Sequence, residues 1–84
     1  MKISKIRKVL GTNVKYYRFQ LKLSQEQLAE NCNLSPRYIS DIENFKGNIA
    51  IDTLENIAKN LKVEPYLLLK DQGDNTLKKR INTK

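Results

Sequence analysis

Apolar residues recur with helical spacing from the start of the chain to about residue 70. The first set is Ile6, Leu10, Val14, Tyr17 and Leu21, which follow one another at steps of four, four, three and four residues. Those steps place the five side chains on one face of a helix. The spacing therefore predicts an amphipathic first helix from Ile6 to Leu21.

Two helix starts then follow one another directly between residues 24 and 44. The first is Ser24, an N-cap with Gln27 at N3, and the two form a capping box that satisfies two amide donors. The second is Ser35, an N-cap followed by Pro36 at N1, where a missing N–H costs nothing. Between them, Asn33 tolerates the left-handed backbone that a tight turn needs. The pattern predicts one helix over about 25–31 and another over about 36–44, a helix-turn-helix of the kind that reads the DNA major groove.

The remaining apolar positions predict two more helices. Asp52 and Glu55 offer a second capping box, at the start of a fourth helix. Pro65 suits N1 of a short fifth helix from Tyr66 to about Lys70. The chain shows no β alternation, internal repeat or glycine-rich phosphate loop. We therefore expect an all-α fold, a compact five-helix domain over residues 1–70 and a flexible basic tail over 71–84. The expected core comprises Leu28, Ala29, Leu34, Ile39, Ile42, Leu54, Ile57, Ala58, Leu61, Val63 and Leu68.

Composition excludes several classes of protein. A chain of 84 residues builds one small domain, near the size at which oligomerisation helps to stabilise a fold. It has one cysteine, Cys32, and no His, so neither an internal disulfide nor an ordinary zinc site can form. No nucleophile with an adjacent base is available, and no apolar run or signal segment points to a membrane or to secretion. We expect a cytoplasmic protein that is not an enzyme and needs no metal, cofactor or small-molecule ligand.

Basic residues concentrate at the two ends of the chain. Residues 1–25 hold seven Lys or Arg and no acidic residue. Residues 26–70 hold five basic and seven acidic residues, and residues 71–84 contribute +2 to the total net charge of +7. Such clusters favour a polyanion, most often nucleic acid, or form a solvated surface that aids solubility. The charge alone leaves both open, and the helix-turn-helix pattern favours DNA.

The positions from Leu10 to Leu69, about 60 of the 84 residues, resemble the lambda-repressor-like helix-turn-helix family of phage repressors, Cro proteins and small bacterial regulators. Within that family, the stretch from Tyr38 to Glu43 and the loop from Gly47 to Ile51 resemble the controller proteins of restriction–modification systems most closely. The chain departs from the family where glycine usually follows the first and third helices, since Lys22 and Phe45 stand there. We expect Gly47 or Asn44 to supply a left-handed residue instead. The matching positions are Leu10, Gly11, Val14, Arg18, Leu23, Ser24, Gln25, Leu28, Ala29, Leu34, Ser35, Tyr38, Ile39, Ser40, Ile42, Glu43, Leu54, Ile57, Ala58, Leu61, Val63 and Leu68.

The resemblance also implies which residues contact DNA. Arg37 holds a position that commonly reaches base edges in the family, and a guanidinium pairs bidentately with guanine O6 and N7. A phosphate contact or a solvated arginine is the alternative. Asp41 either accepts from cytosine N4 or repels non-specific DNA, and Tyr38 either touches DNA or is half-buried. The candidates for base contacts are Pro36, Arg37, Tyr38, Ser40, Asp41 and Asn44, and those for phosphate contacts are Gln25, Ser35, Lys46 and Asn48. Arg18 and Glu43 occupy the two family positions that form a structural ion pair.

Large apolar residues crowd the predicted fifth helix. Tyr66, Leu67 and Leu69 are too many for one face of so short a helix to bury beside Leu68, and an exposed apolar patch marks an interaction site. A homodimer interface or a tail folded back through its own apolar residues would cover them. Two functions remain: a homodimeric, sequence-specific regulator of transcription bound to double-stranded DNA at a near-palindromic operator, or a protein-interaction module of the same fold, such as an antitoxin.

Overall fold

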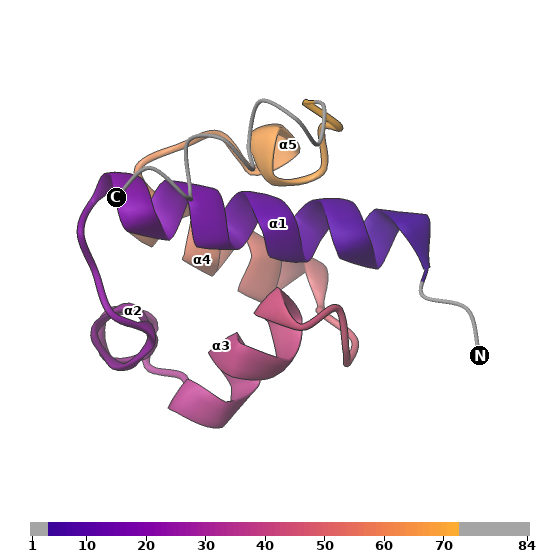
Figure 1. Ribbon diagram of the computed structural model, residues 1–84. Coiled ribbons are helices and arrows are strands. Elements are labelled where there is room, and N and C mark those ends of the chain that lie inside the picture. Colours follow the sequence, from indigo (N-terminus) through magenta and orange to yellow (C-terminus); the bar gives the residue numbers. More distant parts are fainter. Residues whose placement is uncertain (1–3, 73–84) are drawn as a thin grey trace.

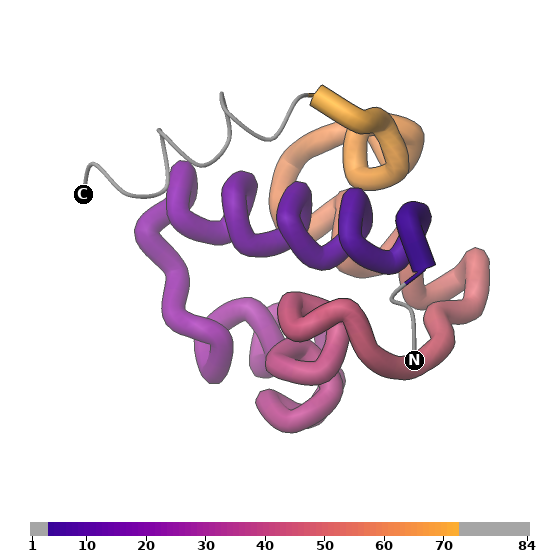
Figure 2. Tube along the Cα trace, turned by 45° about the vertical axis from the view of Figure 1, so that its right-hand side comes forward, coloured from indigo at the N-terminus to yellow at the C-terminus, as the bar shows by residue number. Residues whose placement is uncertain are grey.

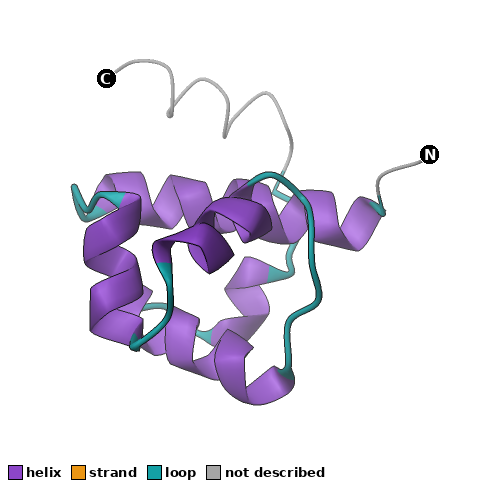
Figure 3. Ribbon diagram, turned by 90° about the horizontal axis from the view of Figure 1, so that it is seen from below, coloured by secondary structure: helices purple, strands orange, loops and turns teal. Residues whose placement is uncertain are grey.

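The computed structural model describes residues 4–72, and that range folds into five helices without a strand. In Figure 1, α5 lies on one side of α1, α2 and α3 lie on the other, and α4 passes behind. Figure 3 shows the same helices joined by loops alone. The all-α prediction is confirmed, while residues 73–84, most of the predicted tail, lie outside the described range. The helices are α1 (Lys5–Gln20), α2 (Gln25–Cys32), α3 (Pro36–Glu43), α4 (Ile51–Leu61) and α5 (Pro65–Leu68).

The helix-turn-helix forms from the local signals that predict it. The Ser24 hydroxyl accepts from the Gln27 N–H at 3.0 Å, and the Gln27 side-chain oxygen accepts from the Ser24 N–H at 2.8 Å. The Ser35 hydroxyl accepts from the backbone N–H of Tyr38 at 3.0 Å. Asn33 makes the turn with a φ of 60°. Each cap satisfies amide donors that the first turn of a helix leaves without partners, and this sets where α2 and α3 begin.

The chain reverses at Lys22 and Phe45 themselves, contrary to the expectation that a neighbouring residue would replace the family glycines. Both are left-handed, with φ of 59° and 68°, whereas Asn44 has a φ of −98°. Gly47 is left-handed as well, but it lies two residues further on. The N–H of Lys22 binds the carbonyl of Phe19, and that of Leu23 binds the carbonyl of Arg18, the pair of bonds that closes a Schellman motif. These bonds fix which residue must be left-handed, whatever its side chain.

Two helix boundaries differ from prediction. Helix α4 begins at Ile51 with Ala50 as its N-cap, so the predicted capping box at Asp52 is wrong. Asp52 lies in the first turn, where a negative charge favours the helix dipole. Helix α5 starts at Pro65 as expected but ends at Leu68 rather than near residue 70. There the side-chain amide of Asn13 binds the carbonyls of residues 67, 68 and 70, so α5 ends against α1.

The core lies between α1 and the other four helices. Leu34 and Val63, expected in the core, are only partly buried at its edge. Ile6 is 52% exposed and lines an open cavity together with Leu69. At Gly11, a Cβ would stand 2.4 Å from the carbonyl oxygen of Ile42, so α1 and α3 meet through backbone. The buried cluster comprises Leu10, Val14, Leu28, Ala29, Cys32, Ile39, Ile42, Leu54, Ile57, Ala58, Leu61 and Leu68.

Candidate nucleic-acid interface

Helix α3 turns its apolar side inward and a polar ridge outward. The Arg37 side chain is 87% exposed, and its Nε lies 3.6 Å from Oδ1 of Asp41, one helical turn further along. Next to them, the Asn44 side-chain amide donates to the carbonyl of Ser40 at 2.9 Å and to its hydroxyl at 3.3 Å. Pro36 is also exposed, at the start of the helix. Five of the six candidates for base contact thus share one accessible ridge. An exposed pair such as that of Arg37 and Asp41 contributes less than about 1 kcal/mol, so both side chains can rearrange around a ligand.

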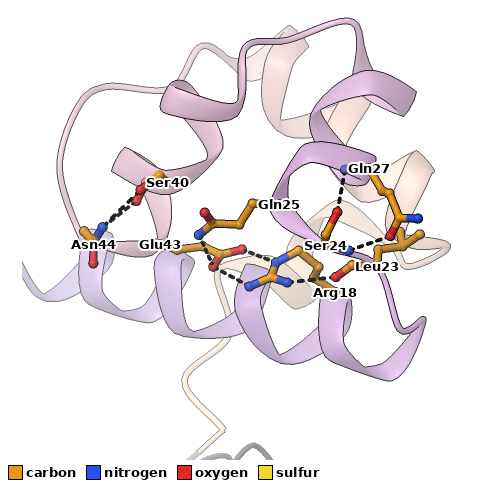
Figure 4. A network of polar contacts seen from close by, with 8 residues as sticks. All are labelled: Arg18, Leu23, Ser24, Gln25, Gln27, Ser40, Glu43 and Asn44. Atoms are coloured by element: carbon orange, nitrogen blue, oxygen red, sulfur yellow. Dashed lines mark hydrogen bonds and ion pairs between the residues drawn. The ribbon is translucent and has the colours of Figure 1, made fainter.

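A buried ion pair fixes α3 against α1. Arg18 donates from Nε to one carboxylate oxygen of Glu43 at 2.7 Å and from Nη2 to the other at 2.9 Å (Figure 4). The two side chains are 8% and 3% exposed. Arg18 Nη1 also donates to the Leu23 carbonyl at 2.8 Å, and the Gln25 amide donates to Glu43 at 3.0 Å. The pair therefore joins α1, the start of α2 and the end of α3, and holds the ridge of α3 at one angle.

The four candidates for phosphate contact occupy two places. Gln25 and Ser35 lie at the starts of α2 and α3, where backbone N–H groups and the helix dipole favour an anion. One amide proton of Gln25 is engaged by Glu43, which leaves the other for a ligand. Lys46 and Asn48 are exposed in the loop after α3.

Tyr38 faces that loop rather than the outer ridge. Its ring is partly buried against the core, and its hydroxyl donates to the carbonyl of Asn48 at 3.1 Å. This placement matches the half-buried alternative. Any base contact by Tyr38 would come from the edge of its ring, because the hydroxyl already has a partner.

Two residues of α1 make long-range contacts that no sequence motif signals. Arg7 donates from Nε to the Gly47 carbonyl at 2.8 Å and from Nη2 to the side-chain oxygen of Asn48. Figure 2 shows this loop beside the start of α1. Asn13, fully buried, binds the end of α5 through its amide. In the sequence Arg7 is one of several basic residues near the chain start, and its partners lie about 40 residues away.

The predicted dimer patch is partly open. Tyr66 and Leu69 are 64% and 38% exposed, while Leu67 is half-buried. Beside Leu69 lies an open cavity of about 180 Å³, which Ile6 and Ile49 also line. Two of the three residues predicted for the interface therefore present apolar surface to solvent.

Other chemistry is sparse in the described part of the chain. Over residues 4–72 no group of three His, Cys, Asp or Glu side chains is arranged to hold a metal, and no helix is long and apolar enough to cross a membrane. Burial raises the pKa of the Cys32 thiol, an effect that a hydrogen bond with Asn60 opposes. A thiol in such a setting is less reactive than a free one.

The fold and this surface define a helix-turn-helix protein. The helix-turn-helix family model matches residues 14–68, and the chain belongs to that family. It is 43% identical over 65 residues to the control protein C.BamHI of Bacillus amyloliquefaciens, an alignment that spans 76% of this chain and 80% of the relative.

Solved structures agree with the sequence relatives. The hypothetical transcription factor NHTF from Neisseria has a TM-score of 0.80 and 35% identity, covering 93% of this chain and 88% of its own. The restriction–modification controller protein C.Esp1396I, solved on a 19-base-pair DNA duplex, has a TM-score of 0.71 and 32% identity, covering 93% and 97%. The chain is a DNA-binding transcription regulator of the phage-repressor and controller-protein type.

Proposed function

We propose that the protein is a homodimer that regulates transcription by sequence-specific binding to a near-palindromic operator, with α3 of each protomer in the major groove. The observation that carries this proposal is the polar ridge of α3, which is exposed on one side and fixed by the buried Arg18–Glu43 pair on the other. A reading helix needs both properties, because base contacts discriminate only when the side chains enter the groove at a defined angle.

Arg37 is the principal base reader in this proposal. Among the side chains that form ion pairs in the described residues, that of Arg37 is the most exposed, and its planar guanidinium can donate to guanine O6 and N7 together. Asp41 sits one turn away, where it can orient the guanidinium or accept from a cytosine amine. Pro36, Ser40 and Asn44 complete the ridge. The relative C.Esp1396I was solved on duplex DNA, which supports duplex DNA as the ligand here.

Dimerisation would come from α5. Tyr66 and Leu69 expose apolar surface that water solvates poorly, and a two-fold axis would make this patch self-complementary. The same axis would place the two α3 helices to enter grooves one helical turn apart, roughly 34 Å. Half-sites at that spacing define the near-palindromic operator.

Base reading is tested with a duplex that the wild-type protein selects from a random library. We expect Arg37→Ala to lose about 5-fold to 150-fold in affinity, the equivalent of roughly 1–3 kcal/mol, and to lose its preference at one base pair of each half-site. Gln25→Ala is the control, since a phosphate contact is lost equally on every sequence. If Arg37→Ala weakens selected and random duplexes alike, Arg37 does not read bases.

Dimerisation is tested by sedimentation equilibrium at tens of micromolar protein. Leu69→Glu places a carboxylate in the patch and should yield a monomer, whereas Asn31→Glu, on an exposed position of α2, should leave the dimer intact. A monomeric wild type, or a Leu69→Glu variant that still dimerises, would rule out this interface.

A further inference from the structure

Arg7, near the start of α1, contacts the loop that follows α3 through two hydrogen bonds. Its Nε donates to the Gly47 carbonyl at 2.8 Å and its Nη2 donates to the side-chain oxygen of Asn48. The Tyr38 hydroxyl donates to the Asn48 backbone carbonyl at 3.1 Å. One residue of the loop is thus held from two helices, by its backbone and by its side chain.

These bonds engage three acceptor oxygens of the loop, all of them on Gly47 and Asn48. The Gly47 carbonyl, the Asn48 carbonyl and the Asn48 side-chain oxygen all face donors within the protein. Each of these oxygens carries partial negative charge and would repel a phosphate. With Oδ1 bound to Arg7, the planar amide holds Asn48 Nδ2 in a fixed position, and its two protons are available to another partner.

Within the described part of the chain, Asn48 keeps two donor groups without a partner. Among residues 4–72, neither Nδ2 nor the backbone N–H of Asn48 has a partner, and no carboxylate pairs with the nearby Lys46 or with Arg7. Arg7 binds neutral groups here, so its positive charge is not cancelled. Because the three oxygens of Gly47 and Asn48 are engaged within the protein, the surface around Asn48 offers donors and positive charge, which suits an anion.

We propose that Arg7 is a positioning residue of the DNA-binding surface: together with Tyr38 it holds Asn48 so that Nδ2 donates to a phosphate of the DNA backbone. This inference rests on the proposed function and extends the interface to a residue of α1 outside the helix-turn-helix. It assigns Arg7 a geometric role that depends on the planar fork of its guanidinium, which a lysine cannot reproduce.

The test is a double-mutant cycle on DNA affinity at fixed salt, with the selected duplex and a random duplex of equal length. Arg7→Met should weaken both about tenfold, the loss expected for one hydrogen bond to a charged group. Arg7→Lys keeps the charge and should recover little of that loss. In an Asn48→Ala background, Arg7→Met should cost less than about twofold more, since the contact is already gone.

Lys8→Met is the matched control, because the Lys8 side chain is exposed, neighbours Arg7 and makes no hydrogen bond or ion pair among the described residues. It removes one charge from α1 and should change affinity far less than Arg7→Met. Thermal unfolding is measured for every variant, and affinities are compared at a temperature where all of them are folded, which separates the effect from a loss of folded protein.

Three results would overturn the inference. Arg7→Met could bind like the wild type, Arg7→Lys could restore wild-type affinity and so show that only charge matters, or the losses from Arg7→Met and Asn48→Ala could multiply. In each of these cases the wild type still selects its duplex, and the proposed function stands. A wild type that binds no duplex DNA would overturn both proposals.

Discussion

The buried pair of Arg18 and Glu43 allows a sharp prediction about stability. Replacing either residue alone leaves the other charge in a place that water barely reaches, since the side chains are 8% and 3% exposed. After Arg18→Met, the Glu43 carboxylate keeps only the Gln25 amide at 3.0 Å. After Glu43→Leu, the Arg18 guanidinium keeps the Leu23 carbonyl at 2.8 Å and the Phe19 ring, whose centroid lies 4.9 Å from Cζ.

The expected magnitudes differ between the single and the double replacement. Removing one member of a buried pair costs about 3–5 kcal/mol, which is most of the stability of a small domain at about 5–15 kcal/mol. The double variant, Arg18→Met with Glu43→Leu, leaves no buried charge and replaces the pair with apolar groups of similar size. Its remaining deficits are the Leu23 carbonyl, which loses a partly buried donor and costs about 1–3 kcal/mol, and the Gln25 amide, which loses Glu43 as its acceptor but is partly exposed to water. The double variant should therefore be more stable than either single variant.

Urea unfolding followed by circular dichroism measures these differences. All variants are compared at one protein concentration, because self-association would add to the apparent stability of each. The midpoints should shift while the slope against urea stays constant, which shows that the change lies in stability rather than in the unfolded state. Single variants that lose less than about 1 kcal/mol, or a double variant that loses the sum of both, would refute this account of the pair.

Four further outcomes are expected. Asn13→Leu removes the donor that binds three carbonyls at the end of α5 and should cost about 1–3 kcal/mol in urea unfolding. It should also weaken self-association, and unchanged sedimentation would contradict a role of Asn13 in placing α5. Gly11→Ala puts a Cβ 2.4 Å from the Ile42 carbonyl and should cost about 1–3 kcal/mol, measured by thermal unfolding. An unchanged unfolding temperature would show that α1 and α3 can move apart without cost. Asp41→Asn should raise affinity for random duplex DNA in gel shifts, because an exposed carboxylate repels phosphates, and should change stability by less than about 1 kcal/mol. Lower affinity would show that the carboxylate is needed to orient Arg37. Since burial raises the pKa of Cys32, its thiol should react with iodoacetamide only slowly near neutral pH until urea unfolds the chain, and rapid labelling of the native protein would count against this.

The sequence alone determined the helix-turn-helix and the face of α3 that is exposed. The caps at Ser24 and Ser35 each bind an amide three residues away, so they depend only on residues within one helical turn. The turn at Asn33 likewise depends on the conformational preference of one residue. The steps of three and four between Arg37 and its neighbours place the ridge on one side, whatever the helix packs against.

Local signals failed where packing imposed the backbone. Lys22 and Phe45 are poor choices for a left-handed residue, and the sequence therefore favoured Gly47 or Asn44 as the left-handed residue. The Schellman bonds at each helix end, together with the close approach of α1 and α3 at Gly11, require those two positions instead. Asp52 carried a capping signal of equal quality to Ser24, yet the N-cap of α4 is Ala50, two residues earlier.

Tertiary structure alone decided which polar side chains cooperate. Arg7 meets Asn48 across 41 residues, and Asn13 meets the end of α5 across 54 to 57. No period or spacing in the sequence signals these contacts, because they depend on how α1 lies across the loop after α3 on one side and α5 on the other. A hydrogen bond between distant residues forms only after the apolar faces have packed and brought its donor and acceptor within about 3 Å.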